Sequence, residues 1–311
     1  MFKTASITEL RENLAETIDI LEKDAAVLVV RHSKPAAYLV APEFFESLIE
    51  QLEDLIDLRD MDAALADYHQ GKAVSAEALI RWDQPQRGWV SPAKFIPLAE
   101  KTDLILLIGH WVLMQGCTTL VRWAKHPATK HLKLAVNVSA RQFRQVDFVE
   151  QVQQVLRESG ANPKQLKLEI TESLIMDNLD DTIAKMYAIK QLGVGFSIDD
   201  FGTGYSSLSY LQRMPLDQLK IDQSFVGDLV DDDSQDAAII RIILALGKSL
   251  GLNVIAEGVE TEVQWNYLNK CGCSVFQGYL FGKPMSLAEF ESHLLKPYKQ
   301  RLGINDRSHV C

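Results

Sequence analysis

Acidic and amide side chains recur at the carboxyl ends of apolar, strand-like runs along this chain. They are Glu77, Asn137, Glu169, Asp199 with Asp200, and Glu257. Buried parallel strands are typically continuous runs of Val, Ile and Leu, and a charged group among them costs free energy unless it is paired or bound to a metal ion. Carboxylate and amide oxygens are the ligands that hard divalent cations prefer. The pattern therefore predicts a metal site where these oxygens meet.

Strand parity supports this placement. Successive side chains of a strand point to opposite faces, so Glu77, Leu79 and Arg81 share one face of their strand. The same alternation puts Lys220 and Asp222 together on another strand. We therefore expect the polar side chains to face the interior of the fold.

Seven candidate strands alternate with helical patterns from residue 74 onward. They are 74–82, 132–139, 166–171, 195–200, 216–222, 253–258 and 274–279. The intervening segments, such as FVEQVQQVLRESG and DAAIIRIILALGKSLG, carry apolar residues at the three- and four-residue steps of a helix. Repeated strand–helix units predict an α/β fold with a parallel sheet closed into a barrel, and the active site of such a barrel lies at the carboxyl ends of its strands.

The segment before residue 73 follows a different pattern. Lys3 to Ile7 is strand-like, Thr8 begins a helix, and the β-rich runs AAVLVVRH and AAYLVAP are joined by a turn at Ser33-Lys34-Pro35. After Pro42, FFESLIEQLEDLIDLRDMDAALADYHQG predicts one long amphipathic helix that stops at Gly71.

Composition limits the classes of function. The chain has 311 residues, 47% hydrophobic and 24% charged, which suits one large domain and a small one. The formal net charge of −10 argues against an overall basic surface for nucleic acid. A protein this acidic that handles an anionic substrate would need metal ions to offset the repulsion.

Neither a signal sequence nor a disulfide framework is expected. The N-terminus MFKTASITELREN has no apolar core, and no stretch approaches the roughly 20 uninterrupted apolar residues of a membrane span. We therefore expect a cytoplasmic protein that does not bind membranes. The cysteines Cys117, Cys271, Cys273 and Cys311 are too irregularly spaced for disulfides or a zinc site, so reduced thiols are expected.

Residues 1 to about 72 resemble the Phd/YefM antitoxins. The resemblance rests on SITELRENL (6–14) and VVRHSKP (29–35). It implies a small α+β domain that dimerises, binds operator DNA and uses its C-terminal part to wrap a partner toxin. The residues that the resemblance assigns to DNA phosphates are Lys3, Thr8, Arg11 and Arg31, each of which as a single residue would otherwise be a solvated surface group.

Residues from about 74 to 296 resemble the EAL-domain family. The stretch EALIRW (77–82) matches the motif that gives the family its name. Seven further motifs follow in order: SPAKFIPLAEKT (91–102), LAVNVSARQF (134–143), LEITES (168–173), SIDDFGTGYSSLSYL (197–211), LKIDQSFV (219–226), VIAEGVET (254–261) and FQGYLFGKPM (276–285). The resemblance implies a (β/α)8-type TIM barrel and a phosphodiesterase that hydrolyses cyclic di-GMP to linear pGpG with two Mg²⁺ or Mn²⁺ ions.

The resemblance also implies roles for the residues at the metal site. The first ion would be bound by Glu77, Asn137, Glu169 and Asp199, and Asp199 with Asp200 would reach the second. Two cations about 3.5–4 Å apart can activate a water and steady the attacking and leaving oxygens at phosphorus. Lys220 would lie beside the attacking water, and Glu257 would be either a ligand or the general base.

Further residues are implied in substrate binding and loop support. Those assigned to the substrate are Leu79, Arg81, Asp222, Gln277, Phe281 and Pro284, with Phe281 as a stacking surface for guanine. Glu172 and Glu260 would anchor the loop around DDFGTG, whose glycines Gly202 and Gly204 allow it to move. Taken alone, an Arg at a barrel rim is usually solvated and a Phe is usually core.

One departure from the family pattern stands out. EAL domains usually begin with a strand of the "YQPI" type that pairs antiparallel with the strand bearing the named motif, and this chain shows no such strand before residue 74. We therefore expect a barrel that lacks its usual first strand. The barrel would then be gapped, or AVLVVRH, AAYLVAP or a second copy of the chain would fill the vacancy.

Three functions remain open on the sequence. The first is hydrolysis of cyclic di-GMP, the second is a binding-only receptor for it, and the third is a DNA-binding antitoxin fused to a damaged barrel. The expected domain limits are 1–72 for the antitoxin-like part, 73–300 for the EAL part and 301–311 for a tail. We also expect a homodimer.

Overall fold

The structure is a computed structural model that describes residues 3–12, 26–31, 34–40, 60–66, 72–84, 88–175, 178–203, 208–227, 229 and 234–295. The chain divides into two compact units. The first comprises Met1–Asp57 with Trp82–Gly88, and the second comprises Leu58–Arg81 with Trp89–Cys311.

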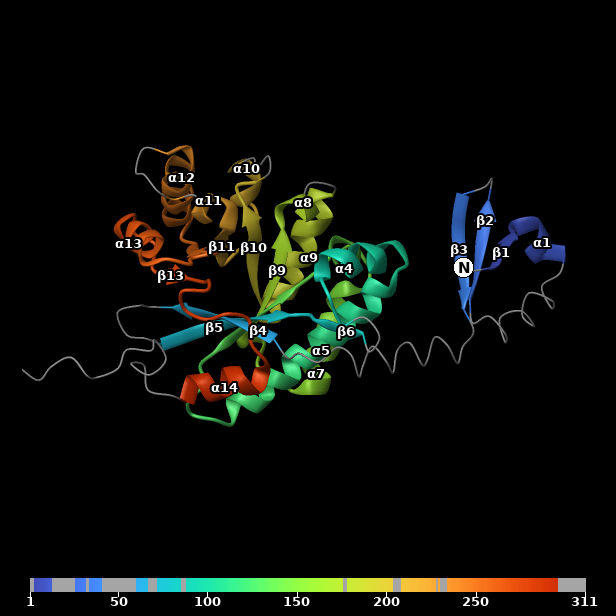
Figure 1. The fold of residues 1–311 in the computed structure, drawn as a ribbon, viewed down its shortest axis with the longest axis horizontal. Helices are drawn as coiled ribbons and strands as arrows, with labels where there is room; N and C mark the ends of the chain where they lie inside the picture. The colour runs from blue at the N-terminus through green and yellow to red at the C-terminus, as the bar shows by residue number, and fades with distance from the viewer. Residues whose placement is uncertain are drawn as a thin grey trace, which may run out of the picture. The chain divides into compact units, whose positions relative to one another are not determined.

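The first unit contains a three-stranded sheet and a short helix (Figure 1). Its elements are β1 (Lys3–Ser6), α1 (Ile7–Glu12), β2 (Ala26–Arg31) and β3 (Lys34–Val40). β1 pairs parallel with β2, and β2 pairs antiparallel with β3. The predicted strand, helix and hairpin are confirmed. The predicted turn is too long, because Lys34 and Pro35 belong to β3 and pair with Arg31 and Val30.

The second unit is built on a closed barrel of eight strands (Figure 1). The strands are β4 (Asp60–Ala66), β5 (Lys72–Leu79), β8 (Lys133–Asn137), β9 (Leu166–Thr171), β10 (Gly195–Phe201), β11 (Gln218–Ile221), β12 (Asn253–Ala256) and β13 (Val275–Phe276). From β5 to β13 every neighbouring pair is parallel, whereas β4 is antiparallel to both β5 and β13. All seven predicted barrel strands are confirmed.

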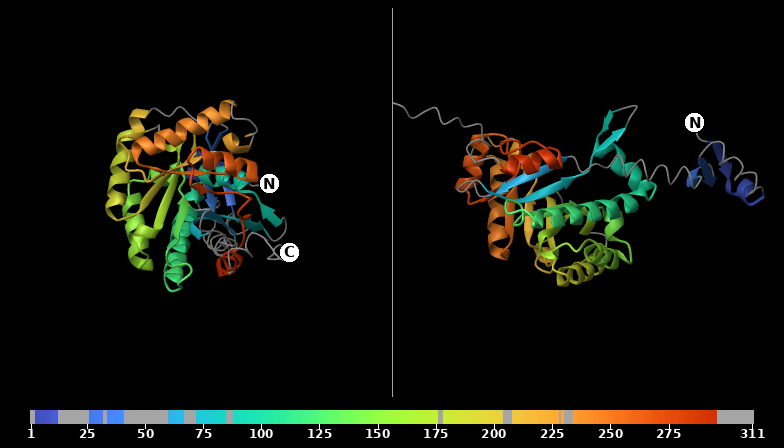
Figure 2. Two further views of the ribbon diagram at one scale, coloured as in Figure 1. Left: turned by 90° about the vertical axis from the view of Figure 1, so that its left-hand side faces the viewer. Right: turned by 90° about the horizontal axis from the view of Figure 1, so that it is seen from below.

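Helices lie outside the ring of strands in the two views of Figure 2. They are α4 (Pro92–Lys101), α5 (Leu104–Ala124), α6 (Ala140–Phe143), α7 (Phe148–Ser159), α8 (Glu172–Ile175), α9 (Leu179–Gln191), α10 (Leu208–Leu211), α11 (Gln223–Gly227), α12 (Gln235–Leu250), α13 (Glu262–Lys270) and α14 (Leu287–Leu295), with a 3₁₀ turn at Pro163–Gln165. β6 (Trp82–Gln84) and β7 (Gly88–Val90) form a separate two-stranded sheet.

The expectation of a missing first strand is wrong. β4 pairs along its length with β5, from Asp60 opposite Leu79 to Ala66 opposite Lys72, and Ala66 also pairs with Val275 of β13. The proposed substitutes are also wrong within the described chain, because β2 and β3 pair with each other and a single chain closes the ring.

The long helix predicted from Pro42 to Gly71 is wrong over residues 60–66, and its other residues lie outside the described ranges. The sequence of β4, DMDAALA, is poor in the β-branched and aromatic residues typical of strands and continues an upstream helical pattern. Pairing with the free edges of β5 and β13 overrides that preference, because an open barrel would leave both edges without backbone partners.

The main apolar core lies between the strands and the helices. In β8 and β9, Leu134, Val136 and Leu168 face outward and are fully buried. α7 covers this region through Phe148, Val152, Val155 and Leu156, at the three- and four-residue spacing expected of an amphipathic helix. Because the outward positions supply the core, the inward positions at the strand ends are free to be polar.

Helix α5 is long and apolar enough to span a membrane by length and composition, with a mean hydropathy of 1.7, and half of that window is buried. Its buried face includes Leu113, Cys117 and Leu120, and it contacts β8 and α7. These contacts identify it as a core helix of the barrel.

Candidate active site at the carboxyl end of the barrel

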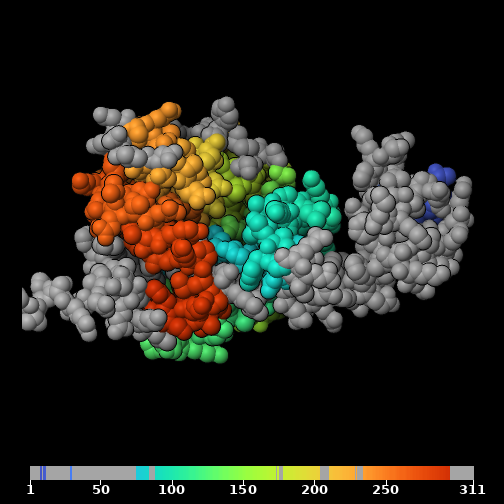
Figure 3. Space-filling model, viewed as in Figure 1, coloured from blue at the N-terminus to red at the C-terminus, as the bar shows by residue number. Residues whose placement is uncertain are grey.

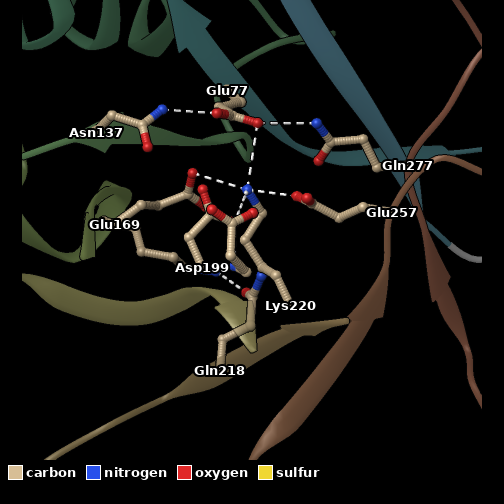
Figure 4. Close-up of polar contacts among 10 residues, drawn as sticks. Glu77, Asn137, Glu169, Asp199, Gln218, Lys220, Glu257 and Gln277 are labelled. Atoms are coloured by element: carbon tan, nitrogen blue, oxygen red, sulfur yellow. Dashed lines mark hydrogen bonds and ion pairs between the residues drawn. The ribbon is translucent and has the colours of Figure 1, made fainter. Parts of the chain in front are cut away.

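The ammonium group of Lys220 lies among four carboxylates inside the barrel mouth (Figure 4). Its Nζ is 2.5 Å from Glu257 Oε1, 3.0 Å from Glu169 Oε2, 3.1 Å from Asp199 Oδ1 and 3.3 Å from Glu77 Oε2. Lys220 is 1% exposed, so water cannot screen these charges. The four acidic groups thus outnumber the single cation in a buried space.

Barrel register brings these side chains together from separate strands. Asn137 at the end of β8 pairs with Glu169 of β9, and Asp199 of β10 pairs with Thr171, two residues after Glu169. Lys220 of β11 pairs with Ile255, two residues before Glu257. Parallel strands in register end at the same edge of the sheet, which is why residues as far apart in sequence as 77 and 257 share one site.

Glu77 is held by three donors. Asn137 Nδ2 donates to its Oε1 at 2.7 Å, and Gln277 Nε2 and Lys220 Nζ donate to its Oε2 at 2.8 and 3.3 Å. Burial opposes ionisation of this carboxyl, but the Lys220 charge and the hydrogen bonds lower the pKa of Glu77 below its usual value. Glu77 is therefore a carboxylate at neutral pH, and Asn137 keeps its Oδ1 as an acceptor.

The other buried carboxyls respond differently to the same surroundings. Burial, together with the charges of Glu77, Asp199 and Glu257, raises the pKa of Glu169 well above its usual value despite Lys220. Burial and the neighbouring carboxylates likewise raise the pKa of Glu257 to about 8. Burial opposes the charge on Lys220, but the four carboxylates raise its pKa well above its usual value. The site thus holds a permanent cation and more acid groups than that cation can neutralise.

Asp200 and Asp222 lie beside this cluster and affect each other's pKa. Asp200 is exposed, has a left-handed backbone with φ of 52°, and donates its backbone N–H to Asp199 Oδ1 at 3.1 Å. Burial and the charges of Asp199 and Asp222 raise the pKa of Asp200 to about 6. Burial opposes ionisation of Asp222, but hydrogen bonds from Ser224 and Asp200 lower its pKa. A non-glycine residue in this backbone region is uncommon and often marks a functional position.

The donor set fits divalent cations. Glu77, Glu169 and Asp199 each offer an oxygen, and these oxygens lie within 4.8 Å of one another; Asp199, Asp200 and Glu257 form a second such group that shares Asp199. Hard cations such as Mg²⁺ and Mn²⁺ take oxygen ligands of this kind. The excess negative charge around Lys220 is what two such ions would neutralise.

A mostly apolar pocket of about 520 Å³ adjoins the carboxylate cluster. Leu79 and Arg81 line it together with Asn137, and Ile96 and Ile105 contribute to its walls. Arg81 Nη1 also donates to Ile80 O at 3.1 Å. Two of the residues predicted to bind substrate therefore share a pocket with a predicted metal ligand.

The remaining residues predicted to bind substrate are placed differently. Gln277 is buried and donates to Glu77, so its amide faces the carboxylate cluster. Phe281 is 6% exposed and stacks on Phe276 with ring centroids 6.0 Å apart. Pro284 is half-buried. The predicted contacts of Gln277, Phe281 and Pro284 with substrate stay predictions.

The two residues predicted to support the loop lie in contrasting surroundings. Glu172 is buried, and neither of its carboxylate oxygens has a hydrogen-bond partner among the described residues. Glu260 is exposed, and its backbone N–H donates to Gln264 Oε1 at 2.8 Å. Gly204 lies outside the described ranges, so the anchoring of the DDFGTG loop stays a prediction.

The candidate DNA contacts also stay predictions. Thr8 and Arg11 are exposed on α1, while Lys3 and Arg31 lie on β1 and β2, where only the backbone is described. Of the cysteines, Cys117, Cys271 and Cys273 are free thiols as expected, and Cys311 lies outside the described residues.

Sequence reasoning missed the residue that holds the loop after Glu257. Gln264 is buried, accepts from the backbone N–H groups of Glu260 and Thr261, and donates from Nε2 to Val226 O and Gly227 O. The side chain of Thr261 in turn caps α13 by accepting from Gln264 N, which completes a capping box. The spacing of Thr261 and Gln264 was the available signal.

A contact between two polar residues inside the barrel, Lys167 and Gln218, was not predicted. Lys167 Nζ contacts Gln218 Oε1, and both side chains are buried. Burial lowers the pKa of Lys167 to about 8 despite the charge of Glu169. Strand alternation predicts that Lys167 faces inward with Glu169, and the same alternation puts Gln218 on the inner face two residues before Lys220, but it does not indicate that the two side chains meet.

Comparisons with known proteins agree with this geometry. Residues 64–284 match the EAL domain, and residues 3–77 match the antitoxin Phd_YefM family of type II toxin–antitoxin systems. The bifunctional diguanylate cyclase/cyclic di-GMP phosphodiesterase MucR of Pseudomonas aeruginosa is 44% identical over 256 residues, which cover 78% of this chain and 37% of that protein. The chain thus spans less than half of the length of this curated relative.

Solved structures show the same fold. A MucR phosphodiesterase in complex with cyclic di-GMP superposes with a TM-score of 0.74 at 42% identity, covering 79% of this chain and 98% of that one. Klebsiella pneumoniae BlrP1, in a complex with manganese and cyclic di-GMP, superposes with a TM-score of 0.61 at 29% identity, covering 73% of this chain and 56% of that one. Through residues 64–284, the chain belongs to the EAL-domain family.

Proposed function

We propose that the protein hydrolyses cyclic di-GMP to linear pGpG at the carboxylate cluster around Lys220. The single observation that carries the proposal is the arrangement of Glu77, Glu169, Asp199 and Glu257 on separate strands about one buried cation. Relatives named as cyclic di-GMP phosphodiesterases support the choice of substrate.

Two divalent ions, Mg²⁺ or Mn²⁺, are proposed as cofactors. Glu77, Glu169 and Asp199 would hold one ion with the free Oδ1 of Asn137, and Asp199, Asp200 and Glu257 would hold the second. When bound, the pair would polarise water and offset the charge of the substrate phosphate. The manganese complex of the related BlrP1 supports this choice.

The protein's own groups then have distinct tasks. The oxygen of a water molecule forms a bond to phosphorus and its proton passes to a nearby base, while the bond from phosphorus to the ribose oxygen breaks and that oxygen takes a proton from solvent to become a hydroxyl. Glu257, which lies 2.5 Å from Lys220 at the edge of the cluster, would be ionised once the metal ions are bound and is then suited to accept that proton. Lys220 keeps its charge and stabilises the negative charge that develops on the phosphoryl oxygens.

The pocket beside the cluster supports a nucleobase as part of the substrate. Its apolar walls, including Ile96 and Ile105, suit the flat face of a guanine, and Arg81 at its border suits a phosphate. Because the pocket shares Asn137 with the carboxylate cluster, a base bound there would leave its phosphate near Lys220.

Product analysis tests the proposal. The protein is incubated with cyclic di-GMP and Mn²⁺, and pGpG is measured by chromatography. Glu77→Gln should lose most of the activity, because it removes one charged ligand, whereas Glu150→Gln on the exposed face of α7 should not. Binding of cyclic di-GMP without pGpG formation by the parent would replace the proposal with a receptor function. Equal turnover by the parent and Glu77→Gln would exclude this site.

A second function is favoured by the match of residues 3–77 to the Phd_YefM antitoxins. We propose that the first unit binds operator DNA, in a homodimer, and a partner toxin. Arg11 is exposed on α1 and is available to contact a phosphate. A gel shift with DNA from upstream of its own gene should be weakened by Arg11→Ala and unchanged by Arg144→Ala on the barrel. Equal shifts by all three proteins would exclude this role for Arg11.

A further inference from the structure

A second cavity of about 710 Å³ lies at the end of the barrel strands opposite to the carboxylate cluster. It is bordered by Asn253, the first residue of β12, and by Ser274, which precedes β13. The carboxyl ends of these two strands lead to Glu257 and Gln277, so the strands separate this cavity from the proposed active site. Its helical walls are α12 and α13, which both reach the molecular surface in Figure 3.

Three cationic side chains line this cavity. Arg241 and Lys248 lie seven residues apart on one face of α12, and Lys270 is the last residue of α13. Arg241 Nη1 donates to the hydroxyl of Tyr267 at 2.8 Å, which orients the guanidinium. Among the described residues, the cavity lining contains no Asp or Glu, and neither Lys248 nor Lys270 has an ion-pair partner.

The helix dipole explains only part of this arrangement. Lys248 and Lys270 stand in the last turns of their helices, where cations are favourable on any protein. Arg241 stands in the middle of α12, where the dipole favours no charge. The chain as a whole has a net charge of −10, but three cations from two helices make this cavity locally positive. A positive cavity attracts anions.

The remaining walls suit an organic group. Leu244, Leu252 and Val254 supply apolar surface to the cavity. Asn253 donates from Nδ2 to Asp217 O at 3.3 Å, which leaves its Oδ1 to accept a hydrogen bond. A cavity that combines cations, apolar wall and a side-chain acceptor matches a ligand that joins phosphates to a nucleobase.

We propose that this cavity binds a small phosphorylated anion of mononucleotide size, with the phosphates at Arg241, Lys248 and Lys270 and the base against Leu252 and Val254. The site is separate from the carboxylate cluster and needs no metal ion. The proposal therefore does not depend on hydrolysis of cyclic di-GMP.

Cys271 gives a natural reporter for the site. It lines the cavity and is half-buried, whereas Cys117 and Cys273 are buried and burial raises the pKa of each thiol to about 11. In the full-length chain with Cys311→Ser, a maleimide should therefore label Cys271 first. The labelling rate is measured with EDTA present, with and without ATP or pyrophosphate, so that the metal-dependent site does not contribute.

The expected result is that ATP slows labelling of Cys271 severalfold and at lower concentration than pyrophosphate. Lys248→Ala with Lys270→Ala should raise the ATP concentration needed by at least about tenfold, which corresponds to ~1.4 kcal/mol. The matched control is Lys94→Ala with Lys101→Ala, which removes two exposed lysines from α4 and should change nothing. Each variant is compared with and without ATP, because a lost lysine also changes the intrinsic reactivity of the thiol.

Three outcomes would overturn the proposal: no protection by ATP, equal protection by ATP and pyrophosphate, or protection that survives loss of both lysines. Isothermal titration calorimetry with ATP on the same variants gives a second readout that does not involve the thiol. Failure of the phosphodiesterase assay with retained protection would refute the proposed activity alone, and the reverse result would refute this site alone.

Discussion

Lys220 Nζ lies 3.0 Å from Glu169 Oε2, and both side chains are only 2% exposed. A buried ion pair is costly to form and more costly to break on one side, because the remaining charge has neither water nor a partner. Here the remaining groups would be four acidic side chains, of which Glu77 is ionised at neutral pH. Lys220 therefore stabilises the site in the absence of metal ions.

Lys220→Met should destabilise the metal-free protein by roughly 3–5 kcal/mol, because it removes the cation from a buried acidic cluster. Mn²⁺ should raise the melting temperature of this variant more than that of the parent, since the ions take over the lost neutralisation. Thermal melts with EDTA and with Mn²⁺ measure both effects.

The matched control is Lys190→Met, whose partner Asp217 is partly exposed at 2.5 Å. It should cost less than about 1 kcal/mol. If the metal-free Lys220→Met variant has the same melting temperature as the parent, Lys220 does not stabilise the metal-free site.

Stabilisation by Mn²⁺ should increase as the pH rises. Burial first, and then the neighbouring carboxylates, raise the pKa of Glu257 from 4.5 to about 8. Without metal, its contribution to stability is present below its unfolded pKa of 4.5 and is lost as the pH rises through about 8. The ions bind the ionised carboxylates, so they compete with protons at low pH. The difference between the melting temperatures with and without Mn²⁺ should therefore be larger near pH 8 than near pH 4.5. A difference that is the same at both pH values would contradict this prediction.

Gly278→Ala should displace Gln277 and destabilise the barrel. Gly278 has a φ of 152°, and a Cβ there would lie 2.3 Å from both the N and the O of Val259. Backbone atoms cannot move aside as the end of a side chain can, so we expect a loss of more than about 2 kcal/mol.

Gly227→Ala is the control for this substitution, because a Cβ on Gly227 meets no atom within 4 Å. Urea denaturation of the two variants measures the difference in their free energies of unfolding. If both unfold with the parent, the close approach of Gly278 to Val259 is not present in solution.

Ala64→Pro should open the barrel. Ala64 lies in the middle of β4 and pairs with Ser75, and proline in a paired strand removes a ladder hydrogen bond. We expect a loss of about 3 kcal/mol and a smaller stabilisation by Mn²⁺, because β5 carries Glu77.

The Ala64→Val variant tests whether residue 64 is in a strand or in a helix. Valine favours strands and slightly disfavours helices, so the variant should be no less stable than the parent if residues 60–66 form β4. Thermal melts of both variants check this. An unaffected Ala64→Pro variant would mean that β4 does not close the barrel.

Much of the site could be predicted from the sequence, because two patterns agree. Strand parity and the polar residues at strand ends both place the same side chains together at one end of the barrel interior. Glu77, Asn137, Glu169 and Asp199 each end an apolar run, and a parallel barrel must bring such ends together. Lys220 was placed inside by the same alternation, and it lies at the centre of the cluster.

Contacts that depend on tertiary neighbours were not predictable in this way. β4 has the composition of a helix and becomes a strand because two open edges flank it. Gln264 holds a loop through carbonyls of Val226 and Gly227, almost 40 residues earlier, and no local pattern indicates those partners. The aromatic ring of Phe281 stacks on Phe276, a pairing that spacing alone does not distinguish from a contact with ligand.

The antiparallel strand β4 also bears on how this chain could have been assembled. Residues 64–77 match both families at once, and they include the end of β4 and most of β5. Since the ring is already complete at Asp60, whatever precedes that residue can be exchanged for another module without leaving a gap in the catalytic framework. The overlap between the two family matches therefore lies in the antiparallel pair β4 and β5, which closes the barrel.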